Sequence, residues 1–159
     1  MEIEKKYLIK TCPFNLENYT NYKIEQGYLS TSPVLRIRQK NTSYILTYKS
    51  PGLMSREEAE FPLTKESYIH LSKKIDGNII TKTRYLIPTD NSLIIELDIF
   101  EGLFSGLILA EVEFPTEDEA NAYLPPNWFG KDVTFEKTYH NSNLSSLSTF
   151  QIHQLLANL

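Results

Sequence analysis

The chain has 159 residues, which is enough for one ordinary domain with a substantial core and too few for two. Its 41% of hydrophobic and 23% of charged residues are typical of a globular protein, and no stretch has the roughly 18 consecutive apolar residues that a membrane-spanning helix needs. The net charge of −4 argues against nonspecific nucleic-acid binding, which usually shows a basic excess on one face, so we expect neither a membrane nor a nucleic-acid partner.

The cysteine content and the first residues bear on cellular location. Cys12 is the only cysteine, which excludes an internal disulfide and fits a reducing compartment. The chain opens with an acidic, strand-like segment rather than a signal-peptide pattern. We therefore expect a cytoplasmic protein.

Polar and apolar residues alternate in several segments, with the period of two that is typical of β-strands. In chain order the predicted strands are 2–10, 25–31, 34–40, 44–50, 56–62, 79–87, 92–100 and 106–114. Turn-like residues at 39–43 and 102–106 predict two hairpins. This alternation predicts about eight strands in a mainly antiparallel sheet.

Three other segments predict helices, the first and the last of them by apolar residues at helical spacing. They are 64–75, 116–124 and about 149–159. The second opens with Thr116-Glu117-Asp118-Glu119, a capping-box pattern in which the Thr hydroxyl and the Glu carboxylate each accept a hydrogen bond from a backbone N–H. Residues 1–159 together therefore predict a single α+β domain.

Like charges recur in pairs on one face of the predicted strands. The pairs are Glu2 and Glu4, Arg36 and Arg38, Glu58 and Glu60 (with Arg56 on the same face), Lys82 and Arg84, Glu96 and Asp98, and Glu111 and Glu113; Lys49 adds a single cation. Such neighbours lie about 6.6 Å apart and repel by about 0.6 kcal/mol in water, or about 2.5 kcal/mol at an effective dielectric of 20. A solvated face explains one such strand. Six of them predict a ligand that compensates the charge.

The apolar faces of the same strands need cover. Eight strands can close into a barrel with room inside for polar side chains or a small ligand. We therefore predict an eight-stranded antiparallel closed β-barrel with a charged lumen and helices packed outside. Acidic and basic pairs in one lumen favour a triphosphate bound with Mg²⁺ or Mn²⁺, since hard cations prefer carboxylate and phosphate oxygens, and Arg and Lys bind the remaining phosphate charge.

Several motifs together match a known family. Glu2-Ile3-Glu4-Lys5-Lys6 has the ExExK signature, and further motifs extend to about Asn141. They are Gln26-Gly27-Tyr28-Leu29, Leu35-Arg36-Ile37-Arg38, Lys49-Ser50, Arg56 to Glu60, Lys82-Thr83-Arg84-Tyr85, Glu96-Leu97-Asp98, Glu111-Val112-Glu113-Phe114 and Lys137-Thr138-Tyr139. The chain resembles the CYTH superfamily, or triphosphate tunnel metalloenzymes, and is most similar to the bacterial short-form inorganic tripolyphosphatases. The resemblance implies an eight-stranded tunnel that binds a triphosphate and a divalent metal.

The resemblance also implies roles for individual residues. The implied metal ligands are Glu2, Glu4, Glu111 and Glu113, with Asp98 as a further one. The implied triphosphate-binding residues are Lys6, Arg36, Arg38, Lys49, Lys82, Arg84 and Lys137, while Glu58, Glu60 and Glu96 are acidic tunnel positions whose role stays open. Lys6 and Tyr28 are candidates for a catalytic dyad; for Lys6 a simple phosphate contact, and for Tyr28 an ordinary strand aromatic, are the alternatives.

The expected activity is metal-dependent hydrolysis of inorganic tripolyphosphate to pyrophosphate and phosphate. The alternatives are a class IV adenylyl cyclase, a thiamine triphosphatase and a non-catalytic module that binds polyphosphate or nucleotide. Trp128 could hold a thiamine ring, although a packing role is the more ordinary explanation. The scattered His70, His140 and His153 do not suggest a zinc site. Apolar area on the outside of such a barrel would also allow a homodimer.

Overall fold

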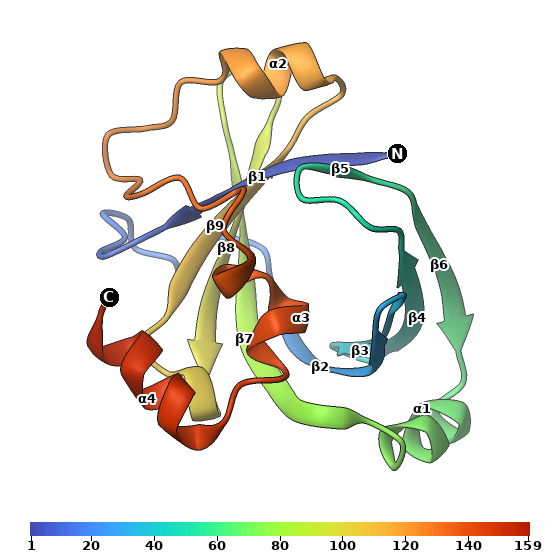
Figure 1. Ribbon diagram of the computed structural model, residues 1–159. Helices are drawn as coiled ribbons and strands as arrows, with labels where there is room; N and C mark the ends of the chain where they lie inside the picture. The colour runs from blue at the N-terminus through green and yellow to red at the C-terminus, as the bar shows by residue number, and fades with distance from the viewer.

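The computed structural model describes residues 1–159 and consists of one β-sheet with short helices around it (Figure 1). The strands are β1 (Glu2–Leu8), β2 (Asn21–Thr31), β3 (Val34–Lys40), β4 (Ser43–Lys49), β5 (Ser55–Arg56), β6 (Glu58–Leu63), β7 (Asp76–Pro88), β8 (Ile94–Glu101) and β9 (Ile108–Glu113). The α-helices are α1 (Lys65–Ser72), α2 (Glu117–Ala122), α3 (Asn141–Leu144) and α4 (Thr149–Ala157), and the 3₁₀ helices are η1 (Gly102–Phe104) and η2 (Lys137–Tyr139).

All strand pairs are antiparallel, and the strands follow one another in the order β5-β1-β9-β8-β7-β2-β3-β4-β6. Only Glu57 separates β5 from β6 in the chain, so the two ends of this order meet and the sheet forms a nearly closed barrel, seen end-on in Figure 1. The predicted antiparallel barrel is therefore confirmed. Both predicted hairpins are also present, as β3–β4 and β8–β9.

The number of strands differs from the prediction because segment 55–63 changes its partner. Arg56 in β5 pairs with Glu2 of β1, whereas Glu58 in β6 pairs with Lys49 of β4. Between them, the Glu57 N–H donates to Ser50 Oγ at 2.8 Å, and the Ser50 N–H donates to the Glu57 carbonyl at 2.9 Å. These bonds to Ser50 interrupt the strand, so one predicted strand becomes two and eight become nine.

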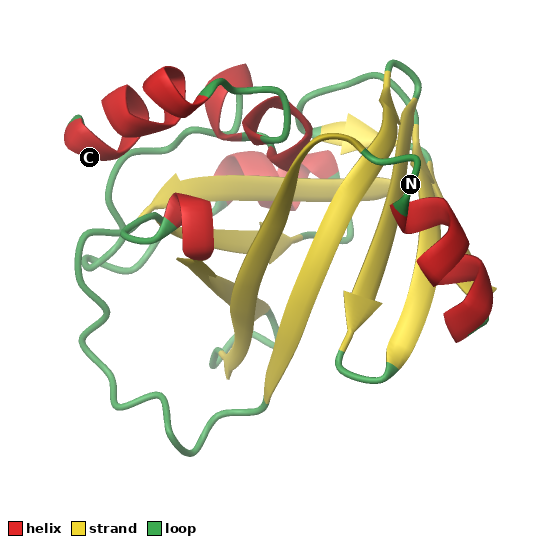
Figure 2. Ribbon diagram, turned by 90° about the horizontal axis from the view of Figure 1, so that it is seen from below, coloured by secondary structure: helices red, strands yellow, loops and turns green.

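Apolar side chains on the outer faces of β1, β7, β8 and β9, with neighbouring residues, form one buried cluster. Its members are Ile3, Tyr7, Ile9, Ile87, Ile95, Leu97, Ala110, Val112, Phe114 and Ala120. Ala120 belongs to α2, and Tyr123, Trp128 and Phe129 from the following segment pack against the same cluster. The helices lie outside the strand layer, as Figure 2 shows, so this part of the core lies outside the lumen as predicted.

A second buried cluster covers part of one end of the barrel. Its members are Tyr28, Ile80, Phe100, Phe104, Leu107, Leu109, Val133, Leu144, Ile152 and Leu155. Phe100 lies two residues beyond Asp98 on β8, on the same inward face of the strand, and its ring centre is 5.3 Å from Lys82 Nζ. The inward face of β8 is therefore charged at Glu96 and Asp98 but apolar at Phe100. Leu144 of α3 and Ile152 of α4 cover this end. The C-terminal helix therefore packs on an apolar end of the barrel.

Side chains fix where the helices begin. Thr64 and Ser148 accept hydrogen bonds from the N–H groups of Ser67 and Gln151 at the starts of α1 and α4. At α2, Thr116 accepts from the Glu119 N–H, but the Glu119 carboxylate accepts from the Thr116 hydroxyl rather than from a backbone N–H, so the predicted capping box is only half formed. None of the helices is both long and apolar enough to cross a lipid bilayer.

Candidate active site

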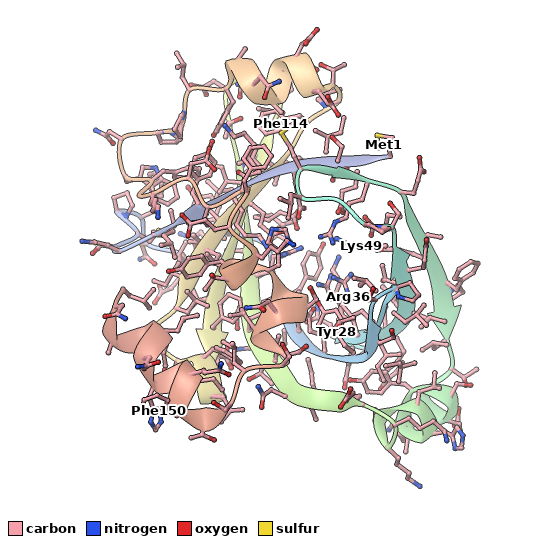
Figure 3. All side chains as sticks on the ribbon, in the orientation of Figure 1. Met1, Tyr28, Arg36, Lys49, Phe114 and Phe150 are labelled. Atoms are coloured by element: carbon pink, nitrogen blue, oxygen red, sulfur yellow. The ribbon has the colours of Figure 1, made fainter.

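The lumen contains a cavity of about 460 Å³, which we call the central cavity, and only three of its 21 lining residues are hydrophobic. Its charged residues are Glu2, Glu4, Glu58, Glu60, Glu96, Glu111 and Glu113 together with Lys6, Arg36, Arg38, Lys40, Lys49, Arg56, Lys82 and Arg84; Tyr28 also borders it. Figure 3 shows Tyr28, Arg36 and Lys49 gathered inside the ring of strands. The strand alternation thus brings nearly all the predicted site residues into one cavity. Asp98 and Lys137 are the two that do not border it.

Strand order separates the charges into two walls. The acidic wall consists of Glu2 and Glu4 on β1, Glu111 and Glu113 on β9, and Glu96 on β8, three strands that are neighbours in the sheet. Glu4 pairs directly with Glu113, and Glu96 with Glu111. The basic wall consists of Arg36 and Arg38 on β3, Lys49 on β4, and Lys82 and Arg84 on β7. Like charges are thus neighbours across strands in the acidic wall, whereas in the basic wall Lys49 pairs with Glu58 and Arg84 with Asp98.

Part of the acidic wall is neutralised within the protein. Glu111 lies 3.5 Å from Lys6 Nζ and 3.5 Å from an Arg84 nitrogen, and Glu2 accepts from Lys49 Nζ at 2.7 Å. Although burial opposes it, the attraction of Lys6 and Arg84 holds the pKa of Glu111 well below its usual range. Glu111 is therefore a carboxylate at neutral pH.

The other part of the acidic wall has no cation beside it. Glu4 and Glu113 form no ion pair; burial, and then the charge of Glu111, raise the pKa of Glu4 to about 7. Burial and the charges of Glu2 and Glu96 raise the pKa of Glu113 as well. Adjacent carboxylates that lack a cation fit a hard divalent ion. No three acidic or His side chains converge as a ready-made metal cage, so such an ion would take further oxygen ligands from phosphate and water, as Mg²⁺ commonly does.

Asp98 lies behind the basic wall rather than in the cavity. Its side chain is fully buried and accepts hydrogen bonds from Arg84 Nε at 2.7 Å, Arg84 Nη2 at 2.8 Å and Lys82 Nζ at 2.6 Å. Burial opposes ionisation, but Arg84 and Lys82 hold the pKa of Asp98 below its usual range. Asp98 thus fixes two cations of the basic wall in place.

The two arginines on β3 are cations without a carboxylate partner. Arg36 is 6% exposed; its Nη2 donates to Thr47 Oγ1 at 3.3 Å, while its buried Nε has no hydrogen-bond partner. Arg38 donates from Nε to Gln26 Oε1 at 2.8 Å. Burial, and then the repulsion of Arg36, lower the pKa of Arg38 to about 9. A buried N–H without a partner and adjacent like charges are costly unless an anion binds between them.

Lys6 and Tyr28 both border the central cavity but form no hydrogen bond with each other. Lys6 Nζ pairs with Glu111 and donates to the Tyr139 carbonyl at 3.5 Å. Tyr28 is buried in the apolar cluster at the end of the barrel, and its hydroxyl forms no hydrogen bond within the protein. This arrangement suits a Lys6 ammonium that binds phosphate and a Tyr28 hydroxyl that is free to bind a ligand.

Trp128 lies outside the barrel. Its ring packs at 5.6 Å from Phe14 and 4.7 Å from Phe129, as part of the apolar layer against β1. It borders no part of the central cavity. The packing explanation for this residue is therefore correct, and a thiamine clamp formed by Trp128 is not.

His140, at the N-terminus of α3, also borders the central cavity, and its Nε2 lies 3.2 Å from the Thr134 carbonyl. Burial, and then the Lys6 cation, lower the pKa of His140 to about 4. The unfolded chain takes up a proton on this residue near pH 6.5, whereas the folded protein does so only near pH 4, so the free energy of unfolding falls as the pH falls through that window.

The pH dependence of stability tests this environment. We expect the stability advantage of the wild type over His140→Gln to shrink as the pH is lowered from about 7 to about 4, when both are measured by urea unfolding. The matched control is His70→Gln, since His70 is exposed on α1. An advantage over His140→Gln that stays constant with pH would contradict a buried, neutral His140.

Comparison with known proteins places the barrel and its cavity in a family. A model of the CYTH domain family matches residues 1–150. The chain belongs to the CYTH family. A CYTH relative from Nitrosomonas europaea, named inorganic triphosphatase, is 41% identical over 147 residues, which cover 91% of this chain and 96% of that protein. Another inorganic triphosphatase, from Acetivibrio thermocellus, is 34% identical over 149 residues, covering 90% and 92%.

Solved structures also resemble this CYTH protein. A crystal structure of an inorganic triphosphatase matches this structure with a TM-score of 0.71 at 37% sequence identity, over 93% of this chain and 96% of that one. The resemblance drawn from the ExExK segment and the paired charges is therefore confirmed at the level of family and fold.

Some lining residues of this CYTH cavity are absent from the set predicted from sequence. They are Lys40, Arg56, His140, Asn141 and Ser142, together with the polar neighbour Gln26, which donates to Asn141. Lys40 lies two residues beyond Arg38, and Arg56 two before Glu58, so strand alternation already places both on the charged face. His140, Asn141 and Ser142 lie at the start of α3, a helix of only four residues that is too short to show a periodic pattern, so no pattern in the sequence indicates their position.

Proposed function

We propose that this CYTH protein is a divalent-metal-dependent phosphoanhydride hydrolase that converts inorganic tripolyphosphate to pyrophosphate and phosphate. One observation carries the proposal: a single cavity holds Glu4 and Glu113, which lack a cation, together with Arg36 and Arg38, which lack an anion. A polyanion bound with divalent cations compensates both sets at once. The two relatives named inorganic triphosphatase support the same substrate class.

The basic wall supplies the phosphate contacts in this proposal. Arg36 and Arg38 have N–H groups not used within the protein, and an arginine side chain can bind two phosphate oxygens at once. Lys49, Lys82 and Lys6 add ammonium groups around the same cavity. Arg84 is already held by Asp98, which pre-orients its remaining N–H groups.

The acidic wall supplies the metal contacts. Glu4 and Glu113, with Glu2 and Glu111 beside them, present the oxygen ligands that Mg²⁺ or Mn²⁺ prefers. Bound there, the cation would polarise phosphate oxygens and lower the pKa of a water molecule. We assign no ligand role to Glu58, Glu60 or Glu96, which also border the cavity.

The reaction needs little covalent chemistry from the protein. The oxygen of a water molecule bonds to the terminal phosphorus as the bond from that phosphorus to its bridging oxygen breaks; pyrophosphate leaves, and the proton lost by the water passes to solvent. Arg36 and Arg38 stabilise the charge that develops on the departing pyrophosphate. We assign Lys6 to phosphate binding, since its ammonium pairs with Glu111, and the free Tyr28 hydroxyl to orienting the water or a phosphate oxygen.

A substrate panel tests the activity. We expect phosphate release to be fastest from tripolyphosphate, slower from ATP and thiamine triphosphate, dependent on Mg²⁺ or Mn²⁺, and abolished by EDTA. Phosphate, pyrophosphate and cyclic AMP are quantified for each substrate. Cyclic AMP and pyrophosphate from ATP would identify a cyclase instead. Tight binding of tripolyphosphate without turnover of any substrate would leave a binding module and overturn the enzyme assignment.

We also place the protein in the cytoplasm. Its one cysteine, Cys12, is a free thiol, which suits a reducing compartment. Cell fractionation tests this location, and recovery in an oxidising compartment would contradict it.

A further inference from the structure

Asn141, the first residue of α3, borders the central cavity but has no part in the proposed reaction. Its carbonyl oxygen Oδ1 accepts hydrogen bonds from Gln26 Nε2 at 3.2 Å and from Lys82 Nζ at 3.3 Å. Gln26 lies on β2, the strand between β3 with Arg38 and β7 with Lys82. Asn141 therefore contacts one cation of the basic wall and is linked through Gln26 to a second.

The neighbours of Asn141 determine which atom of its amide group faces them. Arg38 and Lys82 carry only N–H donors, so each requires an oxygen opposite it. Arg38 Nε donates to Gln26 Oε1 at 2.8 Å, which leaves the Gln26 NH₂ group to donate to Asn141. Two donors, from Gln26 and Lys82, then meet one atom of Asn141, and only the carbonyl oxygen can accept from both. The NH₂ group of Asn141 is therefore directed away from these two residues.

This NH₂ group has no hydrogen-bond partner within the protein. By contrast, the NH₂ group of Asn143, two residues along the chain, donates to the Thr138 carbonyl at 3.1 Å. The only fully buried side-chain polar atoms without a partner are the Tyr7 hydroxyl and Arg36 Nε, so Asn141 Nδ2 is not sealed inside the protein. Because Asn141 borders the central cavity, its N–H groups are available to a ligand there.

The segment that carries Asn141 is anchored to the barrel. Asn78 of β7 donates from Nδ2 to the Leu144 carbonyl at 3.2 Å, and its backbone N–H donates to the Ser145 carbonyl at 2.6 Å. The Leu144 side chain is fully buried in the second apolar cluster. These contacts hold α3 beside the opening of the ring of strands, as Figure 1 shows. Asn141 is thus in place before a ligand binds, which reduces the entropy that binding costs.

We propose that Asn141 is a substrate-binding residue whose NH₂ group donates a hydrogen bond to a phosphate oxygen in the central cavity. The proposal rests on the proposed function in that a triphosphate occupies this cavity. A hydrogen bond from a neutral amide to a charged oxygen adds affinity without adding another cation to the basic wall. Asn141 would then bind the substrate with its NH₂ group while its carbonyl oxygen holds Lys82 in position.

Nuclear magnetic resonance of the nitrogen-15-labelled protein tests the contact, with Mg²⁺ and imidotriphosphate, a slowly hydrolysed analogue of the substrate. The Asn141 side-chain signals are identified by their absence from the spectrum of Asn141→Asp. We expect one Asn141 NH₂ proton to shift downfield as the analogue binds, together with the Arg38 Nε–H. The NH₂ signals of Asn121, exposed on α2, are the control and should not shift.

The other outcomes of this titration contradict the proposal in distinguishable ways. Asn141 signals that stay unchanged while the Arg38 signal shifts would overturn the contact and leave the triphosphate site. If neither signal shifts, no triphosphate binds in the central cavity, and both the contact and the proposed function are overturned. Because no turnover is measured, a protein without hydrolase activity that shows both shifts loses only the assigned reaction.

Variants separate a contact with substrate from support of neighbouring residues. By calorimetry, Asn141→Ala should bind the analogue about ten- to a hundredfold more weakly, the effect of losing one hydrogen bond to a charged group, whereas Asn121→Ala should keep the wild-type affinity. Asn141→Asp keeps an oxygen that accepts from Gln26 and Lys82 but loses the NH₂ group, so it should bind more weakly than Asn141→Ala. Urea unfolding checks that each variant is folded. Tighter binding by Asn141→Asp than by Asn141→Ala would show that only the accepting oxygen matters and would overturn the proposal.

Discussion

Replacing Glu4 by glutamine should reduce phosphate release from tripolyphosphate by more than about a hundredfold, beyond the roughly 10- to 100-fold cost of losing an outer-shell partner of a metal site. Glu4 borders the central cavity and forms no ion pair with a cation of the protein. Glutamine keeps the shape of the side chain but removes the charge that would bind Mg²⁺ or Mn²⁺. The measurement is kcat and KM for tripolyphosphate over a range of metal concentrations.

The same variant should be at least as stable as the wild type in the absence of metal. Burial and the charge of Glu111 raise the pKa of Glu4 to about 7, so the ionised carboxylate destabilises the fold and its removal relieves that repulsion. Loss of activity without loss of stability distinguishes a functional role from a structural one. Glu66→Gln on the exposed face of α1 is the matched control. A Glu4→Gln variant that keeps wild-type activity would contradict the proposed metal site.

Replacing Asp98 by asparagine should lower the free energy of unfolding by about 3–5 kcal/mol, because it leaves two buried cations without their counter-ion. Asp98 is fully buried between Arg84 and Lys82, with three hydrogen bonds of 2.6 to 2.8 Å. Urea unfolding of the wild type and the variant measures the difference. Asp118→Asn, on the exposed side of α2, removes the same charge and should change stability by less than about 0.5 kcal/mol.

This prediction separates two roles for Asp98. The family resemblance implies a metal ligand, whereas its contacts indicate an anchor for the basic wall. An Asp98→Asn variant of nearly wild-type stability that needs much more metal for activity would support the ligand and contradict the anchor. A destabilised variant whose metal requirement is unchanged would support the anchor.

The sequence predicts the barrel and its charged lumen because strand alternation is a local property. Residues two apart on a strand share a face, so pairs such as Arg36 and Arg38, or Glu111 and Glu113, are identified without knowledge of the partner strands. The same rule places Lys49 and Arg56 inside. The opposite faces of the same strands are apolar and must be shielded from water, and helices packed on the outside of a closed sheet provide that shielding.

What the sequence does not predict depends on contacts between distant segments. Glu96 and Asp98 share one face of β8, so the alternation predicts the same surroundings for both. Arg84 lies directly across from Asp98 on β7 and binds its carboxylate, so Asp98 does not border the cavity. Phe100 continues the same inward row, and it becomes part of an apolar end only because α3 and α4 return to cover it. His140 enters the lumen from a segment without periodicity. Local patterns indicate which face a residue occupies but not which partner it meets.

We propose that one cavity holds a triphosphate between an acidic wall that binds metal and a basic wall that binds phosphate. The most direct measurement is a crystal structure with Mn²⁺ and imidotriphosphate, a slowly hydrolysed analogue, in which anomalous scattering locates the metal. We expect Mn²⁺ beside Glu4 and Glu113, with phosphate oxygens against Arg36 and Arg38. Mn²⁺ bound away from the acidic wall, or an analogue bound outside the central cavity, would contradict it.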